Sequence, residues 1–164
     1  RIQTGLRADR SGIRSRAMRR HPALEPFSRD HNTGLILARA LMEERPNAAD
    51  QFREAWDREL ADHFAEEERL LGHLASEGQR ARLIEEHQEI EGLMGGLPES
   101  IVALGEALDA HIRWEERFFF PAIEASASEE QLVALMRDTD VVEERRWEHE
   151  PNRERLVRRR REQR

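Results

Sequence analysis

Two stretches of the sequence repeat one pattern, in which a histidine precedes a glutamate by four residues inside a row of apolar side chains. Each copy reads His, apolar residue, two variable residues, Glu-Glu-Arg and two apolar residues, and the copies begin at His63 and His111. Residues four apart in an α-helix lie about one turn apart on the same side. Glu67 and Glu115 therefore share an apolar face with their histidines. An ionised glutamate on a face that packs inward needs a compensating charge, so the repeat restricts the chain to folds that supply one.

Four segments carry apolar residues at the three- to four-residue spacing of amphipathic helices. We predict helices over residues 26–45, 48–76, 79–94 and 99–124, with Pro121 expected to end or kink the last one. The stripes comprise Leu35, Ala38 and Met42; Phe52, Trp56, Leu60, Phe64, Leu70, Leu71 and Leu74; Leu83, Ile90, Met94 and Leu97; and Ile101, Leu104, Leu108, Ile112, Phe118, Phe119 and Ala122. Strand signals are weak. The predicted fold is all-α, an antiparallel up-down four-helix bundle.

Two further histidines, His31 and His87, continue the stripes of the first and third segments. Each directly follows an acidic residue, Asp30 and Glu86 respectively. The chain thus contains two helical hairpins of the form His…His-x-x-x-Glu, and packing them antiparallel brings four histidines and two glutamates to the centre. The sequence has no cysteine. Imidazole and carboxylate ligands without sulfur suit a pair of iron ions, with manganese or zinc less favoured.

In these residues the chain resembles the hemerythrin-like, His-His-Glu cation-binding family, over roughly residues 26–125. The resemblance implies a four-helix bundle around a non-haem di-iron centre, with an oxo or hydroxo bridge between the irons. It implies four terminal histidine ligands and two bridging glutamates, namely His31, His63, Glu67, His87, His111 and Glu115. The run Phe118-Phe119-Phe120-Pro121 is similar to the end of the family's fourth helix, whereas Gly72-His73 stands where many relatives have a proline.

The sequence departs from the oxygen-carrying members of that family at two places. Those members have a second histidine one turn after the third-helix histidine, where this chain has Glu91. They have an aspartate five residues after the fourth-helix histidine, whereas this chain has Glu115 at four and Glu116 at five. The ligand set is more similar to that of bacterial regulatory and iron-sensing members. We therefore predict Glu91 as an additional candidate metal ligand, which argues against simple reversible oxygen carriage.

The other polar and apolar residues near the motifs have ordinary interpretations. Three glutamates are expected to be solvated or ion-paired, namely Glu66, Glu68 and Glu116. Three histidines are not predicted as ligands, namely His73 at the surface and His21 and His149 in the terminal arms. Four stripe residues are expected to lie near the site, namely Leu35, Ile90, Ile112 and Phe118. Ordinary core packing is the favoured interpretation for them, and a role in limiting access of water and ligands is the alternative.

Charge divides the chain into a bundle and two terminal extensions. Of a net charge of −7, residues 1–22 contribute +6 and residues 151–164 contribute +5, leaving −18 for residues 23–150. We predict a basic arm over residues 1–22, the bundle over 23–127, and a short extra helix with an Arg-rich tail over 128–164. Arg-rich arms can bind phosphate, which leaves nucleic acid open as a partner, but solvated arms are the favoured interpretation. Without an apolar membrane span or signal segment, the predicted location is cytoplasmic.

The motifs favour a non-haem di-iron protein that binds or senses a small ligand such as O2 or NO, or the iron and redox state itself, and signals to a protein partner. Two alternatives stay open. One is a di-iron enzyme, either a peroxidase or an NO reductase, although the sequence offers no general acid beyond Glu91 and no readable substrate pocket. The other is an iron-handling protein, although a single pair of ions stores little.

Overall fold

Helices make up all the regular structure in the computed structural model, which describes residues 20–149 and the side chains of residues 20–146. No strand occurs within this part of the chain, which confirms the all-α class for it. The elements are the 3₁₀ turn η1 (Pro22–Leu24), α1 (Glu25–Met42), α2 (Ala48–Ala55), the π-helical turn η2 (Trp56–Leu60), α3 (Ala61–Leu70), α4 (Glu77–Gly95), α5 (Ile101–Trp114), the π-helical turn η3 (Glu115–Phe119), α6 (Phe120–Ser126) and α7 (Glu129–His149). The predictions for residues 1–19, for the Arg-rich tail and for the side chain of His149 concern positions outside the described residues.

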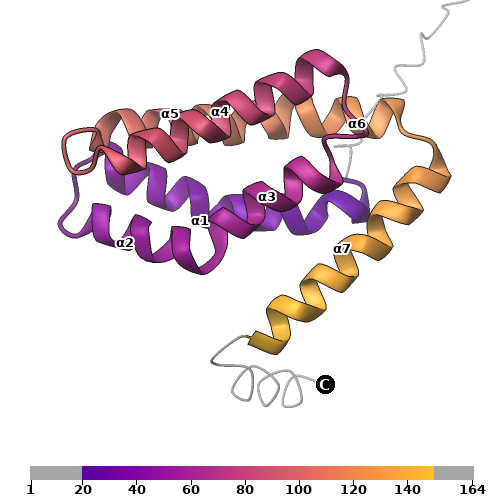
Figure 1. The fold of residues 1–164 in the computed structure, drawn as a ribbon, viewed down its shortest axis with the longest axis horizontal. Helices are drawn as coiled ribbons and strands as arrows, with labels where there is room; N and C mark the ends of the chain where they lie inside the picture. Colours follow the sequence, from indigo (N-terminus) through magenta and orange to yellow (C-terminus); the bar gives the residue numbers. More distant parts are fainter. Residues whose placement is uncertain (1–19, 150–164) are drawn as a thin grey trace, which may run out of the picture.

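The helices form five rods within residues 20–149, because η2 joins α2 to α3 and η3 joins α5 to α6 without a break (Figure 1). The first four rods lie side by side, and each reverses the direction of the one before it after a short connection (Figure 1). The fifth rod, α7, runs obliquely to the others (Figure 1). The contacts are those of a bundle, with α1 packed most extensively on α5 and α4 packed on α5 as well.

Two glycines explain how closely α1 and α5 approach each other. A Cβ atom on Gly105 of α5 would lie 2.7 Å from the backbone oxygen of Ala38 and 2.9 Å from the backbone nitrogen of Met42. A Cβ on Gly34 of α1 would lie 2.6 Å from Cδ1 of Ile112. The missing side chains therefore set the spacing of this helix pair.

The apolar residues form two separate cores along the bundle. One core lies toward the connections that follow α1 and α4, and includes Leu41, Phe52, Phe64, Ile90 and Ile112. The other lies toward α7 and includes Phe27, Leu71, Trp114, Phe120 and Leu135. The histidines and glutamates of the two hairpins lie between these two cores, and the histidine rings contact aromatic rings of both cores. Apolar packing thus closes the polar centre from both ends.

Most predicted helix boundaries differ from the observed ones by a few residues, and the end of the second rod differs most. The prediction carried this helix to Ser76, whereas α3 ends at Leu70. Ser76 instead caps α4: its hydroxyl accepts from the backbone N–H of Gln79, and the Gln79 side chain accepts from the Ser76 backbone. This reciprocal capping box marks a helix start, so it terminates the preceding segment as well.

The prediction that Phe118 packs near the site is wrong. Its side chain is 63% exposed, while Phe119 and Phe120 are fully buried. The π-helical turn η3 holds an extra residue in its turn, which rotates the following residues relative to an unbroken α-helical stripe. Pro121 does not end the helix, which continues to Ser126. Pro121 lies in the first turn of α6, directly after the π-helical turn, where its missing N–H is tolerated.

The C-terminal helix α7 is longer than the short extra helix predicted. It extends through the charged segment to His149 and spans 21 residues. Leu132, Leu135 and Val142 are buried along it, and Thr139 donates its hydroxyl to the Leu135 carbonyl. Ion pairs to the bundle then hold the charged end, as described below for Arg146. Among residues 20–149, no helix has the length and apolar character needed to cross a membrane.

Candidate metal centre

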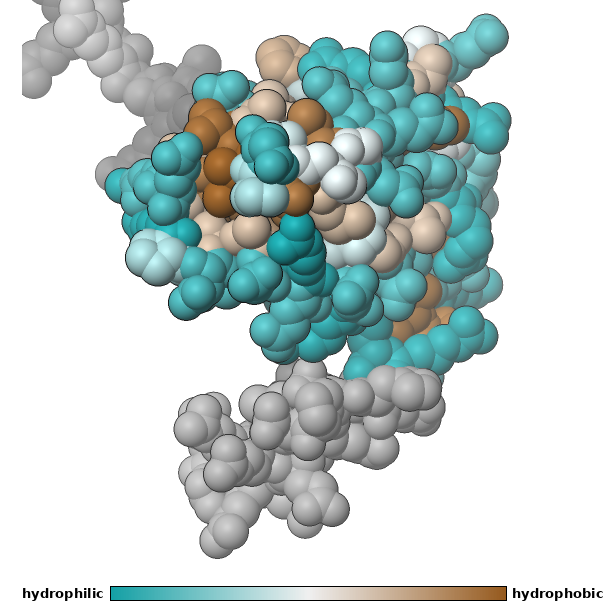
Figure 2. All heavy atoms as spheres, turned by 60° about the vertical axis from the view of Figure 1, so that its left-hand side comes forward, coloured by the Kyte–Doolittle hydropathy of each residue, from teal (hydrophilic) through white to brown (hydrophobic). Residues whose placement is uncertain are grey.

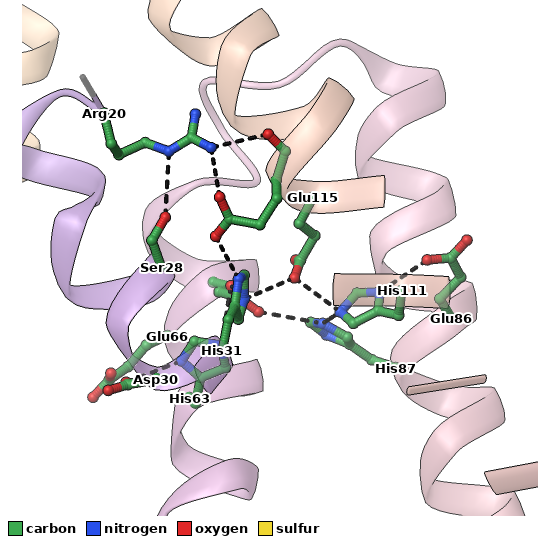
Figure 3. Close-up of polar contacts among 12 residues, drawn as sticks. Arg20, Ser28, Asp30, His31, His63, Glu66, Glu86, His87, His111 and Glu115 are labelled. Carbon is green, nitrogen blue, oxygen red and sulfur yellow. Dashed lines mark hydrogen bonds and ion pairs between the residues drawn. The ribbon is translucent and has the colours of Figure 1, made fainter. Parts of the chain in front are cut away.

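Six side chains of the two repeats meet at the centre of the bundle (Figure 3). They come from four rods: His31 from α1, His63 and Glu67 from α3, His87 from α4, and His111 and Glu115 from α5 and the first residue of η3. The histidines are between 1% and 4% exposed, and both glutamates are completely buried. Two ionisable carboxylates without contact to water are costly unless positive charge lies beside them.

The carboxylate of Glu67 faces histidines on both sides. Its Oε1 lies 3.2 Å from Nε2 of His63 and 3.7 Å from Nε2 of His31. Its Oε2 lies 3.5 Å from Nε2 of His87. One carboxylate thus reaches both hairpins, which is the arrangement that a bridging ligand requires.

Glu115 occupies the matching position on the other hairpin. Its Oε2 lies 3.1 Å from Nε2 of His31 and 3.3 Å from Nε2 of His111. The Nε2 atoms of His87 and His111 are only 3.1 Å apart. All four imidazoles therefore direct Nε2 toward the same small volume as the two carboxylates.

The opposite nitrogen of each imidazole contacts a carboxylate farther from the centre. Nδ1 of His31 lies 2.7 Å from Glu116, and Nδ1 of His87 lies 2.8 Å from Glu68. The other two contacts follow the same plan. Nδ1 of His63 lies 3.2 Å from Asp30, and Nδ1 of His111 lies 2.8 Å from Glu86. The two hairpins match residue for residue in this outer shell. Partners of this kind orient histidine ligands in metal sites and make them more basic.

These outer contacts determine which imidazole nitrogen carries the proton. An ionised carboxylate only accepts hydrogen bonds, so a neutral imidazole facing one holds its proton on Nδ1 and keeps a lone pair on Nε2. The lone pairs of His87 and His111 then point at each other across 3.1 Å. That geometry is unfavourable unless a cation or an added proton lies between them.

Five buried atoms of the inner cluster have no hydrogen-bond partner in the described part of the chain. They are Nε2 of His31 and all four carboxylate oxygens of Glu67 and Glu115. Buried polar groups in folded proteins are almost always paired. Two sets of donor atoms lie close enough to hold an ion, and they share Glu67: His31, His63 and Glu67 form one, and Glu67, His87, His111 and Glu115 form the other. The residues present therefore fit a pair of metal ions.

The charge balance of the metal-free cluster also indicates a site for cations. Burial alone would lower the pKa of His31, but the adjacent carboxylates of Glu115 and Glu116 outweigh it and raise the pKa to about 12. Burial opposes protonation of His63 too, and the attraction of Glu67 raises its pKa to about 9. Burial would raise the pKa of Glu67, yet the neighbouring histidines hold it well below the ordinary value. Ionised glutamates therefore retain protons on the histidines until a cation replaces them.

Two phenylalanine rings hold imidazoles in place. Phe120 stacks on His31 with 5.4 Å between ring centroids and an interplanar angle of 7°. Phe64 stacks on His87 with a centroid distance of 3.9 Å and an angle of 8°. The imidazole planes are thus set by packing as well as by hydrogen bonds.

A small pocket lies against one half of the cluster. It lies against His31, His63 and Glu115, and its remaining walls are Asp30, Gly34, Leu60, Phe64, Leu108 and Ile112. The free space accommodates about one water-sized molecule. Of the stripe residues expected near the site, Ile112 and Ile90 belong to the neighbouring apolar core, and Leu35 packs against it. Ile112 also lines this pocket.

The remaining polar residues singled out from the sequence lie away from the centre. Glu91 is exposed on α4 and belongs to neither set of donor atoms. His73 is exposed in the connection after α3. His21 caps η1, where its Nδ1 accepts from the backbone N–H of Ala23.

The outer shell is the part of the site that sequence reasoning missed. Glu68 and Glu116 are expected from the sequence to be solvated or ion-paired, and both are ion-paired. Their partners among the histidines of the opposite hairpin were not predicted. Asp30 and Glu86 were noted only as neighbours of His31 and His87. The available signal was the repeat itself, because both copies place an acid before the first histidine and a second glutamate after the inner one.

Comparisons with known protein families, with curated proteins and with solved structures found no match.

Proposed function

We propose that the chain is a hemerythrin-like four-helix bundle that holds two iron ions and uses them to bind or sense a small ligand. The observation that carries this proposal is the convergence of four Nε2 atoms and two unpaired buried carboxylates on one volume. Such a cluster is costly without a cation. A pair of ions supplies the missing charge and the missing partners together.

Each residue of the cluster has a distinct task in this proposal. His31 and His63 would hold one ion, and His87 and His111 the other. Glu67 would bridge them, since its two oxygens face different histidine pairs. Glu115 would be the second bridge, because it contacts His31 and His111. When bound, the ions would supply an open coordination position and a change of oxidation state.

The donor set favours iron. Imidazole and carboxylate donors suit iron or manganese, and zinc less well in a paired, carboxylate-bridged site. The described residues offer no sulfur donor near the cluster, and the sequence contains no cysteine. Copper(I) and iron–sulfur chemistry are therefore disfavoured by the ligand type.

The pocket supports binding of a diatomic ligand over conversion of a larger substrate. It has room for about one water-sized molecule beside His31 and His63. Its walls include four aliphatic or aromatic side chains, which exclude bulk water and charged solutes. O2 and NO match these limits in size and polarity. A peroxidase acting on an organic substrate would need a larger opening.

Metal content measured after anaerobic loading with Fe²⁺ tests the first part of the proposal. We expect about two irons per wild-type chain, since the structure provides two sets of donors sharing a bridge. His63→Ala and His111→Ala should each reduce the iron content, whereas His73→Ala, at an exposed histidine, should leave it unchanged. Full iron occupancy in His63→Ala would contradict the assignment.

Absorption spectra recorded before and after adding O2 or NO to the iron-loaded protein test the second part. A band that appears with the gas and disappears on its removal would support binding or sensing. Rapid multiple turnover of the added gas would instead favour the enzyme alternative. An unchanged spectrum with two irons bound would contradict the proposed ligand while leaving the metal site in place.

A further inference from the structure

The four outer carboxylates are held in different ways. Glu86, behind His111, pairs with Arg82 one turn away on its own helix, at 2.6 Å. Glu68, behind His87, is the most exposed of the four, at 38%. The two carboxylates behind the pocket-facing histidines are held by arginines from outside the four-rod bundle, namely Arg20 and Arg146.

Arg146 lies near the end of α7 and connects three rods. Its Nη1 donates to Asp30 of α1 at 2.5 Å, and its Nη2 donates to Glu66 of α3 at 2.6 Å. The same oxygen of Asp30 contacts Nδ1 of His63. A continuous polar chain therefore runs from Arg146 of α7 through Asp30 to His63 in the inner cluster. Figure 3 shows its inner part, from Asp30 to His63.

We propose that Arg146 is a positioning residue for the metal half formed by His31 and His63, and that docking of α7 is thereby coupled to metal binding in that half. The proposal rests on the proposed function, because it concerns the same metal site. Asp30 can turn toward water if the guanidinium is removed, since its side chain is 25% exposed. His63 would then lose the partner that orients its ring. Loss of such an outer partner typically weakens metal binding by about 10- to 100-fold.

The apolar packing of α7 does not depend on this arginine. Leu135 and Val142 belong to the core toward that end of the bundle, and Arg29 of α1 pairs with Glu143. We therefore expect Arg146→Gln to leave α7 folded and packed while breaking the link to Asp30. This separation makes the role of Arg146 measurable.

Coupling between two events acts equally in both directions. If docked α7 strengthens binding of an ion at His31 and His63, that ion must stabilise docked α7 by the same factor. Amide hydrogen exchange in residues 129–146 should thus slow when Fe²⁺ is bound. The docking of α7 would then depend on whether an ion is bound at the pocket-facing half, and a partner that binds α7 would respond to that difference.

The experiment combines Fe²⁺ titration with hydrogen exchange on the full chain under anaerobic conditions. We expect Arg146→Gln to weaken the binding of one of the two ions by about 10- to 100-fold and to leave the affinity for the other within a few-fold of wild type. It should also abolish the iron-dependent protection of α7 against hydrogen exchange. The matched control is Glu66→Gln, which removes the other inter-rod ion pair of the same guanidinium but retains Asp30. It should keep both iron affinities.

Each outcome decides the matter. Equal iron affinities in Arg146→Gln, Glu66→Gln and wild type would overturn the inference and leave the metal site intact. An α7 whose exchange ignores iron in the wild type would overturn it too. Absence of iron binding by the wild type would overturn both this inference and the proposed function. Should Arg146→Gln not fold, Asp30→Asn breaks the same link at its other end, and an unchanged affinity there would contradict the inference.

Discussion

The two halves of the metal centre have matching ligands but different surroundings. Each half has two histidines, each histidine has a carboxylate at Nδ1, and the two halves share Glu67 and Glu115. The pocket described above lies beside the half with His31 and His63. The outer carboxylates of this half pair with arginines from outside the four rods. Glu116 pairs with Arg20, which precedes η1, and Asp30 pairs with Arg146 of α7. The face drawn in Figure 2 carries hydrophilic side chains around a group of apolar ones.

The difference indicates that the repeat and the residues outside it have separate roles in the site. A pseudo-symmetric repeat suffices to build a site for two ions, because each copy contributes the same donors. Access to the site and its control need asymmetry, and this comes from residues outside the repeat: Gly34 and Leu60 at the pocket, and Arg20 and Arg146 behind the histidines. Four predictions break or sharpen this comparison.

Glu67→Ala should have the largest effect, because it removes the ligand that both halves share. We expect loss of both irons, since each half loses the Glu67 oxygen that faces its histidines. Metal content per chain after anaerobic loading with Fe²⁺ measures this. If Glu67→Ala still binds two irons per chain, Glu67 does not bridge.

Raising the pH should strengthen iron binding to the half with His31 and His63. Their pKa values in the metal-free protein are about 12 and about 9, so both imidazoles carry added protons at pH 7. An incoming ion must displace these protons, and affinity should therefore rise by up to about tenfold per pH unit for each proton released. Titrations with Fe²⁺ between pH 7 and pH 9, with proton release followed in weak buffer, check the sign. An affinity independent of pH would contradict it.

Two outer-shell variants compare the halves directly. We expect Glu116→Gln and Glu68→Gln each to weaken the binding of the iron in one half, by about 10- to 100-fold at most. Glu116→Gln should be the more severe, because that carboxylate also pairs with Arg20 and its pKa is held at about 2, burial being outweighed by its hydrogen bond to His31. Affinities from competition with a chelator measure the effect. Equal losses in the two variants would show that the Arg20 contact adds nothing.

Glu91→Ala should have the smallest effect. The Glu91 carboxylate is exposed and outside both sets of donor atoms, so iron content and ligand-dependent spectra should match those of the wild type. A changed spectrum would show that Glu91 reaches the centre in the iron-loaded state and would restore it as a ligand.

Local periodicity explains what could be predicted from the sequence. The four-residue spacing of His63 and Glu67, and of His111 and Glu115, determines that each pair shares one helix face, whatever the rest of the chain does. The apolar stripes and the glycine and proline breaks determine four amphipathic helices. From these follow the all-α class and the grouping of six polar side chains on inward faces.

Contacts between helices were decided only by the tertiary structure. Asp30 contacts His63, and Glu116 contacts His31, although these partners are 33 and 85 residues apart in the sequence. The contacts form because the rods pack in one register. Phe118 points outward because a π-helical turn shifts the stripe after Glu115. Arg146 reaches Asp30 because α7 packs obliquely on the bundle. Side-chain spacing along one helix is a property of the sequence, whereas rod register, turn type and packing angle arise from the whole set of contacts.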